Sequence, residues 1–82
     1  MKEPTTYTRT KPIEFSQLQK IVGGYIEMIT LKNGDQIVFN EDGISLGLPI
    51  NLDASRIVSV DCGFPQSIVG HAVVLKNKAR IE

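Results

Sequence analysis

The side chains in this sequence that could support acid–base or nucleophilic chemistry are few and scattered. His71 is the only histidine and Cys62 is the only cysteine among the 82 residues. A histidine works as a general base only when a nucleophile or an orienting carboxylate lies within reach. Glu41 and Asp42 are adjacent in a predicted turn, so their side chains need not converge on one point. We therefore predict no catalytic residue, and we keep a small hydrolase that uses carboxylates and His71 only as an alternative function.

The sequence also predicts no metal site and no cofactor. Sites built from histidine and cysteine need paired ligands at short spacings, and this chain has one residue of each type. The Gly23-Gly24 pair follows a predicted helix, whereas a phosphate-binding loop follows a strand and opens a helix. These two glycines are therefore interpreted as the end of the helix.

The charge balance argues against nucleic acid as a partner. Nine Lys and Arg residues balance nine Asp and Glu residues, so the formal net charge is zero. Nucleic-acid-binding domains usually carry a basic excess. A nucleic-acid-associated accessory module is kept as an alternative that would need Arg9, Lys11, Lys20 and Arg56 on one face.

The composition favours a cytoplasmic protein that does not enter the membrane. A single cysteine fits a reducing compartment. The first twelve residues contain no apolar segment of the kind found in signal peptides. The longest apolar run is AVVL, residues 72–75, whereas a membrane span needs about 20 residues.

We expect one domain over residues 1–82, because a chain of this length is too short for two. Residues 1–12 are predicted to form a polar arm or an edge strand, and residues 13–82 the core. Pro4 and Pro12 suit an edge position, because proline cannot donate a hydrogen bond within a sheet. Between the two prolines, threonines alternate with larger polar side chains, namely Tyr7, Arg9 and Lys11.

A short helix is predicted to begin at Ser16, which opens the capping-box pattern SQLQ. Leu18, Ile21 and Val22 follow at helical spacing and form one apolar stripe. Gly23 is placed to end the helix in the left-handed conformation. Two turns of helix are not stable alone in water, so the stripe must pack on a sheet.

Asn33-Gly34 predicts a β-hairpin with a two-residue type I′ turn. This turn would pair Lys32 with Asp35 and put Ile26, Met28, Thr30, Ile37 and Phe39 on one face, under the helix. The other face would hold Tyr25, Ile29, Leu31 and Val38, with Glu27 and Asn40 among them.

This second face is too apolar to be left in solvent, so either the rest of the chain or another subunit must cover it. The sequence leaves both alternatives open. Under the second, the protein is a homo-oligomer whose interface includes Ile29, Leu31 and Val38.

Beyond the hairpin, Asn51 or Asp53 is predicted to cap one helical turn, and the alternation in RIVSVDC predicts a strand over residues 56–62. The apolar segment at residues 68–75 is predicted to be the last and central strand. Gly70 within it indicates a bulge or a close approach. The expected fold class is therefore α+β: one short N-terminal helix on a small, mainly antiparallel sheet of four to six strands with an Asn-Gly hairpin.

Four motifs in a fixed order resemble a family of small proteins of phages, plasmids and some bacterial chromosomes that contain a domain of unknown function. They are VGGYIE at residues 22–27, NEDG at 40–43, GLPIN at 47–51 and IVG at 68–70. The resemblance covers roughly residues 15–75. After GLPIN the family is richer in alanine and more helical, whereas this chain has a strand-like pattern. The resemblance implies a mobile-element context and names no catalytic residues.

Together these observations predict a non-enzymatic binding or interaction protein of phage or mobile-element origin, which would act in the host cytoplasm if it is phage-encoded. It would counter host defence by binding a host protein or by sequestering a nucleotide signal at a site shared between subunits. The candidate ligand-binding residues lie near the NEDG and GLPIN turns: Tyr25, Glu27, Asn40, Glu41, Leu48, Pro49 and Asn51.

Overall fold

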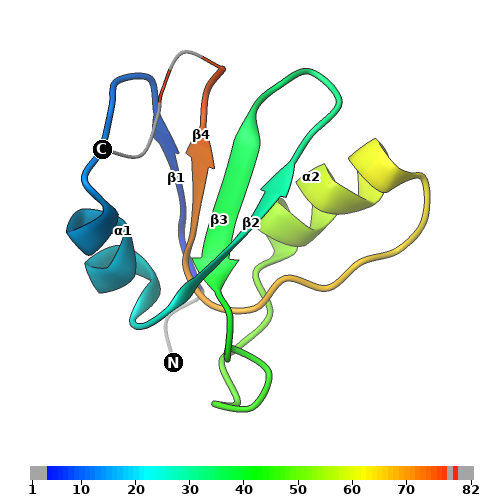
Figure 1. Cartoon of the computed structure of the whole chain (residues 1–82). Helices are drawn as coiled ribbons and strands as arrows, with labels where there is room; N and C mark the ends of the chain where they lie inside the picture. The colour runs from blue at the N-terminus through cyan, green and yellow to red at the C-terminus, as the bar shows by residue number, and fades with distance from the viewer. Residues whose placement is uncertain (1–3, 78, 80–82) are drawn as a thin grey trace.

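The computed structural model describes residues 4–77 and 79, and in this part of the chain two helices pack on opposite faces of a four-stranded mixed sheet (Figure 1). The strand order is β1-β4-β3-β2, with β1 parallel to β4 and the other pairs antiparallel. The α+β class predicted from the sequence is confirmed. In chain order the elements are β1 (Thr6–Arg9), α1 (Phe15–Val22), β2 (Ile26–Thr30), β3 (Gln36–Asn40), α2 (Leu52–Cys62) and β4 (Ala72–Leu75).

The most apolar strand, β4, lies inside the sheet, and all four of its residues are buried. The more polar β1 lies at the edge beside it, where its outer side does not have to pair. An edge strand is one of the two alternatives expected for residues 1–12, although residues 1–3 lie outside the described part. Residues 78 and 80–82 of the predicted core lie outside it as well.

Neither described helix is long and apolar enough to cross a membrane.

Helix α1 ends as predicted but begins earlier. Gly23 adopts the left-handed conformation at φ 84°, and its amide donates to the carbonyl of Gln19 at 2.8 Å. The predicted cap at Ser16 is wrong, because the first helical residue is Phe15 and Glu14 occupies the capping position without a side-chain bond. Leu18 and Val22 are buried against the sheet.

The hairpin turn differs from the prediction by one residue. The Gly34 amide donates to the Leu31 carbonyl at 3.0 Å, and the Leu31 amide donates to the Asp35 carbonyl at 2.7 Å. Gly34 has a φ of 93°, whereas Asn33 keeps a negative φ. The loop therefore has three residues, 32–34. It is a type I turn that ends at the left-handed Gly34, and an Asn-Gly sequence permits this turn as well. Ile29 pairs with Ile37, and the predicted register is wrong by one position.

The shift in register exchanges the two faces of β3 relative to β2, because side chains alternate along a strand. Val38 lies under α1, whereas Ile29 and Leu31 pack on the opposite face with Ala54 of α2. The prediction that Ile29, Leu31 and Val38 share one face is therefore wrong. Leu31 and Val38 are buried by the chain itself, Leu31 on the α2 side and Val38 on the α1 side of the sheet.

Residues 56–62 are helical, so the predicted strand is wrong. Asn51 caps α2 through its Oδ1, which accepts from the Ala54 amide at 3.0 Å, and Gly63 ends it with a φ of 84°. Ala54, Ile57 and Val58 recur at helical spacing and pack on the sheet. The β-branched residues of this segment favour a strand locally, but capping and packing decide in favour of the helix.

The side chain of Asn51 joins three parts of the chain and is only 1% exposed. Besides capping α2, its Oδ1 accepts from Thr6 Oγ1 at 3.0 Å. Its Nδ2 donates to the carbonyls of Gly70 at 3.0 Å and Thr5 at 3.5 Å. The start of β1, the approach to β4 and the start of α2 are therefore held by one buried amide.

Replacing this amide should destabilise the fold. Asn51→Ala removes the cap and leaves the Gly70 carbonyl without its side-chain donor, so we expect a loss of about 2 to 3 kcal/mol in unfolding free energy. Urea denaturation at a constant m value measures it. Asp53→Ala, an exposed change in the same helical turn, is the matched control and should cost less than about 1 kcal/mol. Equal losses for the two variants would contradict this role.

A second polar contact ties the hairpin to the end of β4. The carboxylate of Asp35 accepts from Lys76 Nζ at 2.6 Å, from the Asn77 amide at 2.9 Å and from Asn33 Nδ2 at 3.2 Å. The hydrogen bond from Lys76 is the main reason that the pKa of Asp35 lies below its ordinary value of 3.8, although burial opposes this shift.

This lowered pKa predicts a pH-dependent contribution to stability. The contribution is fully present above pH 3.8, the ordinary carboxyl pKa, and is lost as the pH falls through the lower folded-state pKa. Asp35→Asn should therefore be less stable than wild type at pH 7, and the difference should shrink as the pH falls below about 4. Urea midpoints measured from pH 7 to pH 2 test this, with Asp53→Asn as the control. A difference that stays constant with pH would show that Asp35 acts only through its shape.

Candidate functional site

The parallel pairing of β1 with β4 assembles a cluster of polar side chains on the α1 face of the sheet. Thr6 contacts Asn51 on the α2 side, so its neighbours along the strand point the other way. Tyr7 accordingly contacts His71, with their ring centroids 6.2 Å apart. Arg9 lies on the same face as Tyr7, with its Cζ 5.9 Å from the tyrosine ring centroid.

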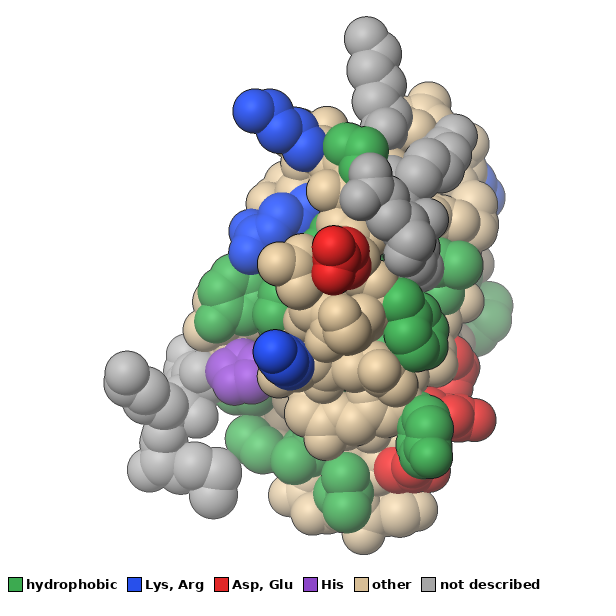
Figure 2. Space-filling view, turned by 60° about the vertical axis from the view of Figure 1, so that its left-hand side comes forward, with side chains coloured by type: hydrophobic (Ala, Val, Ile, Leu, Met, Phe, Trp, Pro, Cys, Tyr) green, Lys and Arg blue, Asp and Glu red, His purple; other side chains and the backbone are tan. Residues whose placement is uncertain are grey.

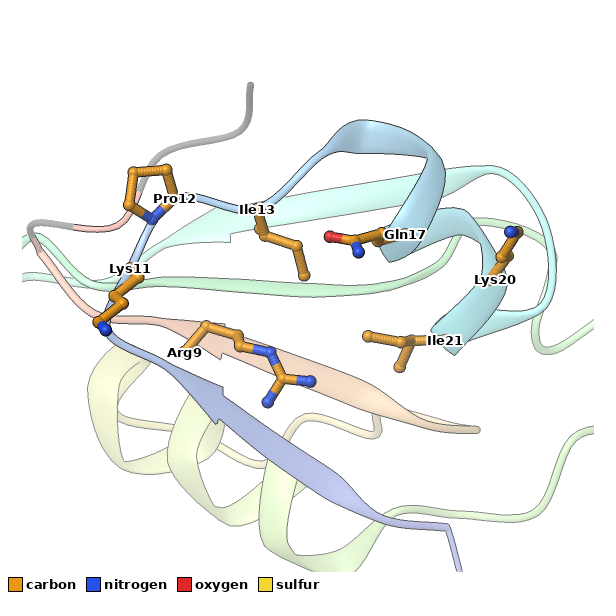
Figure 3. Close-up of a pocket in the computed structure, with 7 residues that line it drawn as sticks. All are labelled: Arg9, Lys11, Pro12, Ile13, Gln17, Lys20 and Ile21. Carbon is orange, nitrogen blue, oxygen red and sulfur yellow. The ribbon is translucent and has the colours of Figure 1, made fainter.

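Between β1 and α1 lies a cavity of about 420 Å³ that we call the basic hollow. In Figure 3 the Arg9 guanidinium lies near its middle, with Lys11 and Lys20 toward opposite ends. Three basic side chains thus surround one hollow, and no carboxylate is among its lining residues in the described part of the chain. The residues that line it are Arg9, Lys11, Pro12, Ile13, Gln17, Lys20 and Ile21.

The lining of the basic hollow follows from the local structure. Strand β1 supplies Arg9, and the connection from β1 to α1 supplies Lys11. Gln17, Lys20 and Ile21 stand at positions i, i+3 and i+4, so they project from one face of α1. A strand and the next helix therefore form opposite walls of the hollow.

A second cavity of about 630 Å³ adjoins the first, and we call it the Tyr7 hollow. Lys20 and Ile21 line both hollows, so the two are neighbours along α1. The walls of the second are mainly apolar or aromatic. Its other lining residues are Pro4, Thr5, Tyr7, Val22, Gly23, Leu48, Pro49, Gly70 and His71.

The imidazole of His71 is held in one orientation. Its Nδ1 accepts a hydrogen bond from the Thr5 backbone amide at 3.0 Å. In the neutral ring the proton must then lie on Nε2, which is left as a donor. His71 is exposed and lines the Tyr7 hollow, so this donor is available to a bound molecule.

On one face of the described part of the chain, charged side chains of the two signs are largely separated, although the formal charges of the full sequence cancel. On the face shown in Figure 2, most Lys and Arg side chains lie on the same side as the histidine, and most Asp and Glu side chains lie on the other. A local cluster of one sign creates a local potential even when the net charge is zero. The zero net charge therefore does not exclude an anionic ligand at this site.

Two of the seven predicted ligand-binding residues, Leu48 and Pro49, line the Tyr7 hollow. The structure does not bring the other five to either hollow. Tyr25, Glu27 and Glu41 are exposed and line neither cavity.

The remaining two, Asn40 and Asn51, are buried and hydrogen-bonded within the fold. Asn40 Nδ2 donates to the Val22 carbonyl at 3.0 Å, and its Oδ1 accepts from the Asp42 amide at 2.7 Å. It joins the end of α1 to the turn after β3, as Asn51 joins β1 to α2. Both amides are occupied by backbone and side-chain partners rather than presented to a ligand.

The sequence carried part of the signal for this site. Tyr7, Arg9 and Lys11 alternate along the N-terminal segment, and the alternative of a basic face grouped Arg9, Lys11 and Lys20 with Arg56. Arg9, Lys11 and Lys20 line the basic hollow. Arg56 projects from α2 and lines other cavities. The contact between Tyr7 and His71 was missed because it depends on pairing two segments far apart in the chain.

The geometry gives no support to a hydrolase that uses His71. Such an enzyme needs a carboxylate within hydrogen-bond reach of the imidazole, directly or through one water. Within residues 4–77 and 79, no carboxylate lines the Tyr7 hollow, and the imidazole accepts its hydrogen bond from the Thr5 amide.

The chain belongs to the family of a domain of unknown function, DUF3846, which it matches over residues 1–81. No curated protein and no solved structure matches it significantly. The family assignment therefore leaves function to be argued from the two hollows.

Proposed function

We propose that this protein is a non-enzymatic binding protein that captures a small phosphate-bearing ligand in the basic hollow. The observation that supports this most directly is the placement of Arg9, Lys11 and Lys20 around one cavity whose described lining has no carboxylate. Guanidinium and ammonium groups donate charge-assisted hydrogen bonds to phosphate oxygens. Arginine is especially suited because its planar fork can bind two oxygens at once.

The shape of the hollow favours an extended anion over a single phosphate. The three cations are spread along the cavity, with Arg9 between Lys11 and Lys20 (Figure 3). Ile13 and Ile21 add apolar surface beside them, and the side chain of Gln17 adds a neutral amide. The apolar side chains can contact uncharged parts of an extended ligand while the exposed cations bind its phosphates.

The proposal is for capture without turnover, as in the sequestration of a nucleotide signal. Phage or mobile-element origin, a place in the host cytoplasm and assembly into a homo-oligomer belong to the same proposal. Binding to a host protein remains the other form of it, with the partner's acidic or phosphorylated groups in the same hollow.

Isothermal titration calorimetry tests the proposal with inorganic tripolyphosphate and a panel of nucleotides at low salt and without divalent cations. Arg9→Gln and Lys20→Gln should each weaken binding at least about fivefold, which corresponds to roughly 1 kcal/mol for a lost ionic hydrogen bond. Arg56→Gln removes the same charge from α2 and should leave affinity within about twofold. Chromatography of the released nucleotide should recover it unchanged.

Absence of binding by every phosphorylated probe would refute the proposal. An equal loss of affinity in Arg56→Gln would show that net charge, rather than the basic hollow, attracts the anion. A hydrolysed nucleotide would refute capture without turnover.

A second candidate is the nucleic-acid-associated module, which the gathering of three basic residues at one hollow favours. With three phosphate contacts, the logarithm of the affinity for single-stranded DNA should fall against the logarithm of salt with a slope of about −2. Fluorescence anisotropy with a labelled oligonucleotide measures the slope, and Lys11→Gln should reduce its magnitude. A slope near zero would remove this candidate.

A further inference from the structure

We infer that the ligand is a nucleoside polyphosphate whose base enters the Tyr7 hollow while its phosphate chain lies along the basic hollow. This inference rests on the proposed capture of a phosphate-bearing ligand and names the class of that ligand. It depends on the adjacency of two cavities that share Lys20 and Ile21 but differ in chemistry, one basic and one mainly apolar and aromatic.

The junction between the hollows sets the direction in which such a ligand lies. Lys20 and Ile21 line both cavities, whereas Arg9 and Lys11 line only the basic one. A molecule that fills both must therefore carry its charge on one side of Lys20 and its uncharged part on the other. A nucleoside polyphosphate has this division, because its base is flat and neutral and its phosphates form a charged chain.

The Tyr7 hollow has the surfaces that hold a nucleobase. Tyr7 and His71 supply two aromatic rings, tilted at 54° to each other, and bases stack on aromatic side chains. Leu48 and Pro49 supply apolar surface, and Leu48 is close-packed, because a Cβ at Gly70 would meet its Cδ1 at 2.7 Å. Ligand sites of this kind combine apolar walls with a few placed polar groups.

The polar group placed for recognition is the Nε2 of His71. The Thr5 amide occupies Nδ1, so in the neutral ring Nε2–H is the remaining donor of an exposed side chain that lines the Tyr7 hollow. The ring nitrogens and carbonyl oxygens of nucleobases are acceptors. Arg9 lies over the Tyr7 ring at 5.9 Å, which links the aromatic wall to the cation at the middle of the phosphate chain.

The order of the cations predicts which phosphate each one contacts. Lys20 at the junction is nearest to the nucleoside, so it contacts the first phosphate, followed by Arg9 and then Lys11 at the far end. Affinity should therefore rise from nucleoside monophosphate to diphosphate to triphosphate. Lys20→Gln should weaken all three, whereas Lys11→Gln should weaken the triphosphate about fivefold and leave the monophosphate within about twofold.

The closing experiment compares ATP, GTP, CTP and UTP with inorganic tripolyphosphate, by calorimetry without divalent cations. His71→Ala should weaken the preferred nucleoside triphosphate at least about fivefold, since a lost ring contact costs roughly 1 kcal/mol or more. It should leave tripolyphosphate affinity unchanged, which serves as the internal control for folding. Arg56→Gln is the surface control for both probes.

A measurement on the wild-type protein covers the case in which a variant misfolds. In two-dimensional NMR spectra, the preferred nucleotide should shift the resonances of Leu48, Gly70 and His71 as well as those of Arg9 and Lys20. Tripolyphosphate should shift only the second group.

The outcomes separate this inference from the proposed function. If tripolyphosphate binds as tightly as every nucleoside triphosphate and the Tyr7 hollow shows no shifts, the inference is overturned and the phosphate-binding function stands. If no phosphorylated probe binds, the proposed function and the inference both fall. If a nucleoside without phosphate binds as tightly as its triphosphate, the assignment of the phosphates to the basic hollow is wrong.

Discussion

The arrangement of this protein depends on one buried amide, the side chain of Asn51. It accepts from Thr6 and from the first turn of α2, and it donates to the segment that leads into β4. These bonds hold the N-terminal strand against β4 in a fixed register. The register determines that Tyr7 lies beside His71 and that Arg9 faces α1, so the geometry of both hollows follows from a residue that lines neither of them.

The small size of the chain explains why its candidate site lies at the surface. A domain of this length has too small an interior to enclose a deep cavity, because most of its apolar side chains form the two core clusters on either side of the sheet. The space between an edge strand and a neighbouring helix is available without removing core contacts. Long basic side chains can line that space while their charged ends remain hydrated, as Arg9 and Lys20 do here.

Local patterns predicted some elements well and others poorly, and the reasons differ. The end of α1 at Gly23 was predicted, and Asn51 was one of two positions expected to cap a helical turn, because each depends on residues close together in the chain. The hairpin failed by one residue because Asn33-Gly34 satisfies two turn types, and the difference reverses the faces of β3. The strand expected over residues 56–62 failed because packing on the sheet outweighs a local preference for extended structure.

By itself, the sequence determined the α+β class and the buried character of β4, and it left a polar arm and an edge strand as the two alternatives for residues 1–12. Only the tertiary structure decided that β1 pairs in parallel with β4, that α2 covers the second face of the sheet, and that three cations surround one hollow. Short-range patterns record the period of a helix or a strand and the chemistry of its ends. They do not record which distant segment becomes a neighbour, and Thr5 and His71, which meet at the site, are 66 positions apart.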